Sequence, residues 1–66
     1  MRISDLRERI TLSFGESWAA SFSQDIALSE IGSLTVNEAL AAGCEAAQIW
    51  RAICAQCPAE TERYRY

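Results

Sequence analysis

The chain has 66 residues, a formal net charge of −3, three cysteines and no histidine, and all six of its bases are arginine. The missing histidine and lysine exclude, within one chain, a Ser-His-Asp triad, a histidine metal ligand, a lysine Schiff base and a P-loop lysine. A chain this short forms one domain, and a domain of about 60 residues buries only about 60% of its unfolded surface, so association often stabilises such domains.

The charged residues are unevenly distributed. Residues 1–9 and 51–66 each carry three arginines against two acids, whereas residues 10–50 hold five acids and no base. An acidic chain is not expected to attract nucleic acid or anionic lipid in bulk. The pattern is typical of a solvated surface; a sharper interpretation is a contact between the basic ends and the acidic middle of two copies.

The beginning of the chain resembles neither a signal peptide nor a membrane segment. Polar side chains interrupt it at once, and no run of about 18 apolar residues follows anywhere. We therefore expect no membrane association, and a cytoplasmic protein with reduced thiols.

The first predicted helix begins with Ser4 as its cap, and Asp5 follows at the positive end of the helix dipole. One helical stripe comprises Ile3, Leu6, Ile10, Ser13 and Phe14. Gly15 suits the left-handed position just past the end of this helix. Residues 10–14 also alternate like a strand, but a lone strand needs a partner, so we favour helix. Leu12 points away from the stripe and is either an ordinary exposed leucine or part of an interface.

The second predicted helix begins near residue 16. Along one side of it, four residues apart, lie Trp18, Phe22 and Ile26. Leu28 and Ile31 would lie on a different side of this helix from Trp18. We therefore expect the helix to break or change direction near Asp25 and to end at Gly32.

The third and fourth predicted helices have clear boundaries. Thr35 and Glu38 form a capping box at the start of the third, which Gly43 ends. The fourth runs from about residue 45 to 56, and Pro58 cannot continue it. Its apolar arc comprises Ala46, Ile49, Trp50, Ile53, Cys54 and Cys57.

These elements predict an all-α fold, a compact bundle of three to four short helices in residues 1–58, followed by a short polar tail in residues 59–66. Ala39, Gly43 and Ile49 have the Ala-x3-Gly-x5-Ile spacing of a helix-turn-helix, in which the alanine allows close approach and the glycine makes the turn. The spacing predicts such an arrangement of the third and fourth helices. The fourth helix offers one base and an acidic start, which disfavours DNA binding.

Cys54 and Cys57 form a C-x-x-C at the end of the fourth helix. Reactive pairs of this kind lie at helix N-termini, where the dipole lowers the thiol pKa. A zinc site that used Cys44 as a third ligand would still lack a fourth. We therefore expect free, packed cysteines, no metal site and no cofactor.

No pair of carboxylates suggests acid–base catalysis, so we predict no catalytic residues and no enzyme activity. Trp18 and Trp50 both lie on apolar stripes and are expected to be buried. The alternative is that one of them is partly exposed and anchors a partner, with Trp50 and Arg51 as the first choice. The candidate partner-binding residues are thus Leu12, Trp50 and Arg51.

Several stretches of the chain resemble a known family. They are Met1-Arg2-Ile3-Ser4-Asp5, Phe14-Gly15, Asp25 with Leu28, Gly32, Leu34-Thr35-Val36, Ala39-Leu40, Gly43, and Ile49 to Cys54. The chain is similar to a family of short actinobacterial proteins, domain of unknown function family 3046. The family usually has Asp-Pro where Glu45-Ala46 stands here, and its pattern does not include Cys44 and Cys57.

The resemblance implies a compact helical protein with no assigned activity, often encoded near DNA-recombination genes. Together with the residues it predicts a non-enzymatic interaction or accessory module, whose partner is an unknown protein or a second copy. The alternative is a nucleic-acid-associated regulator linked to DNA recombination or repair, acting through the helix-turn-helix-like pair.

Overall fold

The computed structural model describes residues 1–64, and Arg65 and Tyr66 of the expected tail lie outside the described residues. Its helices are α1 (Ile3–Phe14), α2 (Glu16–Asp25), α3 (Val36–Ala41), α4 (Ala46–Gln56) and α5 (Pro58–Thr61), with two 3-10 turns, η1 (Ser29–Ile31) and η2 (Glu62–Tyr64). The predicted all-α class is confirmed, since residues 1–64 contain no strand. The predicted number of three to four helices is wrong, because these residues contain five and the fifth, α5, lies where the polar tail was expected to begin.

The helix α1 continues through Phe14, so the strand alternative for residues 10–14 was correctly set aside. It begins two residues earlier than expected, with Arg2 rather than Ser4 as its cap, because the Asp5 side chain satisfies a free donor at this end. The backbone N–H of Arg2 donates to the Asp5 carboxylate at 3.1 Å, and the Arg2 guanidinium lies 3.5 Å away. This backbone hydrogen bond lowers the pKa of Asp5.

Gly15 alone connects α1 to α2. Its N–H donates to the carbonyl of Thr11 at 2.8 Å, and its own carbonyl accepts from Ala19 at 2.9 Å. Its φ of 86° is positive, as glycine allows, but its ψ of 152° is extended, so the expected left-handed conformation is wrong. The extended ψ lets one residue end the first helix and begin the second.

The helix α2 ends at Asp25, where the sequence predicted a break. A loop follows, closed by an isolated antiparallel bridge between Leu28 and Leu34, whose backbone hydrogen bond is 2.9 Å long. The side chain of Gln56 on α4 holds this loop: its amide donates to the carbonyl of Ala27 at 2.9 Å and accepts from the N–H of Ser29 at 3.0 Å.

The capping box that begins α3 is confirmed. The N–H of Glu38 donates to the Thr35 hydroxyl at 3.1 Å, and the N–H of Thr35 donates to the Glu38 carboxylate at 2.9 Å. Ala39 and Ile49 are fully buried, and Gly43 between them has a φ of 89°. These are the packing roles that the spacing predicted for the three residues, while the helix-turn-helix arrangement itself stays a prediction.

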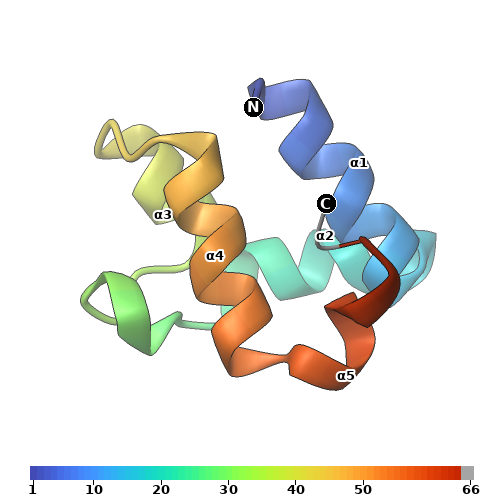
Figure 1. The fold of residues 1–66 in the computed structure, drawn as a ribbon. Coiled ribbons are helices and arrows are strands. Elements are labelled where there is room, and N and C mark those ends of the chain that lie inside the picture. Colours follow the sequence, from blue (N-terminus) through green and yellow to red (C-terminus); the bar gives the residue numbers. More distant parts are fainter. Residues whose placement is uncertain (65–66) are drawn as a thin grey trace.

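The helix α4 lies between α3 and η1 on one side and α1 and α5 on the other (Figure 1), and it packs against all of them. The largest fully buried side chains of the core are Phe22, Leu6, Ile10, Leu28, Ile49, Ile53 and Val36. They come from α1, α2, the loop, α3 and α4, so every long helix contributes its apolar face to one core.

The segment after Pro58 is packed through Tyr64. Pro58 occupies the first turn of α5, where its missing N–H costs no hydrogen bond. Thr61 is fully buried, and its hydroxyl donates to the carbonyl of Cys57 at 2.8 Å. Tyr64 is half-buried against the core, and both α5 and η2 pack on α1. The described part of the expected tail therefore covers one side of α1.

Candidate functional site

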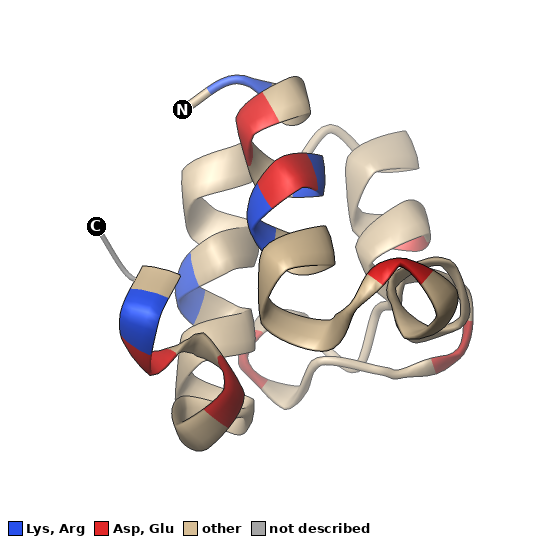
Figure 2. Ribbon diagram, turned by 90° about the vertical axis from the view of Figure 1, so that its right-hand side faces the viewer, with Lys and Arg blue, Asp and Glu red and all other residues tan. Residues whose placement is uncertain are grey.

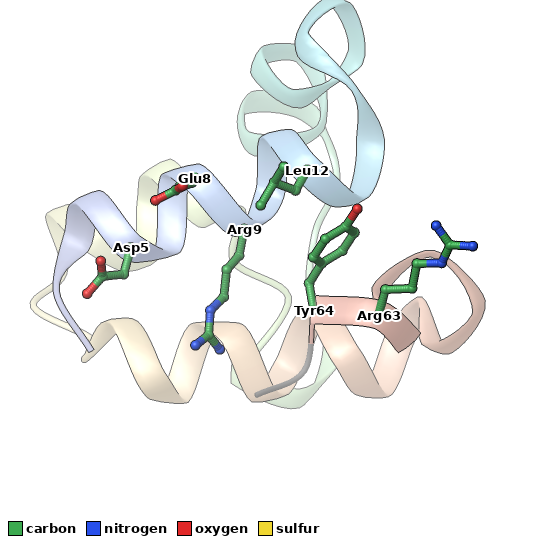
Figure 3. A pocket seen from close by; sticks show the side chains of 6 residues that line it. All are labelled: Asp5, Glu8, Arg9, Leu12, Arg63 and Tyr64. Atoms are coloured by element: carbon green, nitrogen blue, oxygen red, sulfur yellow. The ribbon is translucent and has the colours of Figure 1, made fainter.

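Leu12, a candidate from the sequence, is exposed on α1 and lines a cavity of about 280 Å³. Figure 3 shows Tyr64 reaching from η2 toward α1 near Leu12, while Arg9 points toward α4. The other residues of this cavity are Asp5, Glu8 and Arg63. Two acids and two bases thus surround one leucine, which leaves this cavity with mixed charge and little apolar surface.

Trp50, the preferred candidate for a partner anchor, is only 3% exposed. Its ring packs in the core, and the Arg9 guanidinium lies 5.7 Å from the ring centre. A ring so covered presents no surface to a partner, which agrees with the core position that the sequence favoured. Arg51 beside it is exposed, and it lines a different cavity together with Glu30 and Gln48. The structure thus does not bring Leu12, Trp50 and Arg51 together.

Trp18 is the exposed tryptophan. Its side chain is 45% accessible, so the expectation that both tryptophans are buried is wrong for this one. It borders a cavity of about 340 Å³, which we call the Trp18 cavity. Its lining residues are Ser13, Phe14, Trp18, Phe22, Ile26, Cys57 and Glu60.

Two stacked aromatic rings lie beside Trp18. Phe14 and Phe22 have ring centres 4.2 Å apart and planes inclined by 18°. Phe22 is 2% exposed and belongs to the core, whereas Phe14 is half-buried. The cavity therefore has a firm apolar wall that joins the hydrophobic core, with the Trp18 ring at its exposed side.

Three helices end at the Trp18 cavity. Phe14 is the last residue of α1, Ile26 follows the end of α2, and Cys57 follows the end of α4. Each helix has at least ten residues, and none has a basic residue in its last turn. The C-terminal end of a helix carries about −0.5 of a charge and the N-terminal end about +0.5. Because α2 begins where α1 ends and α5 begins where α4 ends, the helix ends together leave a negative contribution of about one C-terminal end, that of α2.

Acidic side chains add to this potential. Glu60 of α5 is the charged member of the lining, and Asp25 lies on the same face of α2 as Trp18, two turns further along. The helices α2, α3 and α5 carry acids and no base (Figure 2). Burial raises the pKa of the Cys57 thiol, and the nearby Glu60 carboxylate raises it further, as expected where the potential is negative.

The hydroxyl of Ser13 is a polar feature of the same cavity lining. Its oxygen is buried and has no hydrogen-bond partner among the described residues. A buried hydroxyl without a partner loses its hydration without compensation. Ser13 is therefore a local source of instability beside the stacked phenylalanine rings.

The three cysteines are free and half-buried. Among residues 1–64, no group of three or more Cys, Asp or Glu side chains is placed to hold a metal ion. Cys54 and Cys57 lie at the C-terminal end of α4, as the sequence indicated, and Cys57 lines the Trp18 cavity. In the part of the chain that the structure describes, no helix combines the length and apolarity that crossing a membrane requires.

The Trp18 cavity could not be predicted from the periodicity of the helices. The spacing of Trp18, Phe22 and Ile26 correctly placed them on one face of α2, but periodicity does not say how far along a helix the core extends. Here the core reaches Phe22 and stops short of Trp18. Cys57 and Glu60 come to this face only through the turn between α4 and α5.

Comparison with known proteins gives a family and no activity. No curated protein and no solved structure matches the chain significantly. The family described as "Protein of unknown function (DUF3046)" matches residues 1–60. Because this match covers nearly the whole chain, the resemblance found in the sequence is confirmed: the chain belongs to the DUF3046 family of proteins of unknown function.

Proposed function

We propose that this protein is a non-enzymatic interaction module that binds a protein partner through the Trp18 cavity. The observation that carries the proposal is the exposed Trp18 ring beside an apolar cavity whose wall continues into the core. Tryptophan is enriched among the residues that dominate binding energy, and these residues usually lie against well-packed apolar surfaces. A docking role also explains why a large ring is left in contact with water in a domain with little core to spare.

The other exposed apolar residues support docking less well. Leu12 lies among charges of both signs, and Met1 and Ile3 border a cavity of about 410 Å³ that is otherwise lined by Leu40 and mostly small side chains. Neither place has an aromatic wall joined to the core. With this proposal we keep the sequence-based prediction of a cytoplasmic protein whose partner is another protein rather than nucleic acid.

Selection of peptides from a random display library on the immobilised protein tests the proposal. Clones selected on the unmodified protein are then measured on Trp18→Ala and on Leu12→Ala, two variants that each remove an exposed apolar side chain. We expect binding to be lost on the first and kept on the second, with both variants folded by circular dichroism. Clones that bind Trp18→Ala as well as the unmodified protein would contradict the proposal.

A further inference from the structure

The charge around the Trp18 cavity indicates what kind of partner would bind there, if the cavity is the docking site proposed above. The C-terminal ends of α1, α2 and α4 meet there, and none of them has a basic residue in its last turn. The positive N-terminal ends of α2 and α5 also lie nearby, but each already has an acid in its first turn, Glu16 and Glu60. The remaining potential is negative.

The lining combines this potential with aromatic surface. A cation over the face of a tryptophan is attracted by the ring, most often as an arginine guanidinium, which also stacks on it. The molecule itself contains such a pair, since Arg9 lies over the ring of Trp50 at 5.7 Å. Trp18 offers a similar ring to an incoming side chain, with Phe14 to contact an aliphatic stem and Glu60 to meet the charge.

We propose that the Trp18 cavity binds an arginine side chain presented by a basic peptide segment of another protein. The alternative source is a second copy of this chain. Its N-terminal arginines, however, already have partners: Arg2 pairs with Asp5, Arg7 donates to the Asn37 side chain at 2.8 Å, and Arg9 lies over Trp50. A second copy could still offer its exposed Arg51 or Arg63. Each copy carries a net charge of −3, however, so two copies repel each other overall, whereas a basic segment of another protein is attracted.

The test uses the display clones that require Trp18. We expect their sequences to be enriched in arginine next to an apolar residue. A synthetic peptide from the best clone is then compared by calorimetry with the same peptide carrying citrulline, a neutral analogue, in place of the arginine. Loss of the charge should weaken binding about tenfold or more, since both the ring contact and the acidic surroundings favour the cation.

Two protein variants complete the test. Glu60→Gln should weaken binding of the arginine peptide and reduce its salt dependence, because it removes the carboxylate of the lining. Glu62→Gln, a matched control in η2 that does not line the cavity, should leave binding unchanged.

The outcomes separate the two proposals. If Trp18-dependent clones lack basic residues, or if the citrulline peptide binds equally well, the arginine inference is overturned while the docking site stands. If no clone depends on Trp18, the docking site itself is refuted. If sedimentation instead shows self-association that Trp18→Ala abolishes, the occupant is a second copy, which also overturns the inference.

Discussion

Phe14 and Phe22 stack on each other from two different helices, with 4.2 Å between their ring centres, and so join the end of α1 to the middle of α2. The one-residue connection at Gly15 makes this contact possible, because it places the start of α2 directly at the end of α1. The pair connects the hydrophobic core, which holds Phe22, to the Trp18 cavity, which Phe14 lines.

Phe22→Ala should therefore destabilise the domain severely. Replacing a buried phenylalanine by alanine costs about 3–5 kcal/mol, which is comparable to the roughly 3–10 kcal/mol of total stability expected at this chain length. Phe14→Leu keeps the apolar volume and should lose only the contribution of ring stacking, about 0.5–1.5 kcal/mol. Urea unfolding followed by circular dichroism measures the free energy of unfolding of both variants. A loss for Phe22→Ala no larger than that for Phe14→Leu would contradict the core position of Phe22.

The two tryptophans should differ in their accessibility to quenchers. In a Trp50→Phe variant the remaining fluorescence comes from Trp18, which is 45% exposed, and acrylamide should quench it efficiently. In a Trp18→Phe variant it comes from the buried Trp50 and should be quenched much less. Equal quenching in the two variants would mean that Trp18 is covered in solution.

Ser13→Ala should leave the domain as stable as before or more stable. The Ser13 hydroxyl is buried without a partner among residues 1–64, and such a group costs about 1–3 kcal/mol of desolvation. Thr11→Ala is the control, because the Thr11 hydroxyl donates to the carbonyl of Arg7 at 3.0 Å near the surface. Thermal unfolding compares the two variants, and a clear drop in melting temperature for Ser13→Ala would indicate that its hydroxyl is hydrogen-bonded.

Alkylation of Cys57 by iodoacetamide should rise at higher pH than alkylation of an ordinary thiol. Burial and then Glu60 raise the pKa of Cys57, so the reactive thiolate forms late. Glu60→Gln removes one negative charge and should move the rise to lower pH, whereas Glu62→Gln should not. Mass spectrometry of the modified peptides measures the rate at each cysteine.

The raised pKa of Cys57 also makes the stability of the domain depend on pH. The unfolded chain ionises Cys57 at lower pH than the folded chain does, so the contribution of this thiol to folding is complete below its ordinary pKa. This stabilising contribution is lost as the pH rises through the raised pKa that Cys57 has in the folded chain.

The sequence by itself determined the helices. Thr35 and Glu38 satisfied each other's backbone donors within four residues, and the break near Asp25 and the end of α4 before Pro58 followed from equally local rules. Three features differed from the prediction. The start of α1 differed because Asp5 reached back to Arg2, and the conformation of Gly15 differed because one residue had to serve two helices. A further short helix, α5, formed after Pro58 where a polar tail was expected. The capping box and the helix ends depend on residues that are neighbours along the chain, and a sequence shows these neighbours directly.

The tertiary structure decided the site. Whether Trp18 or Trp50 reached the surface depended on where the core ended, and both rings lay on equally regular apolar stripes. The meeting of three helix ends with Glu60 depended on the turn that brings α5 against α1. Helical periodicity specifies the direction of a side chain around its own axis, but exposure and electrostatic potential are sums over every element packed nearby, and these exist only once the chain has folded.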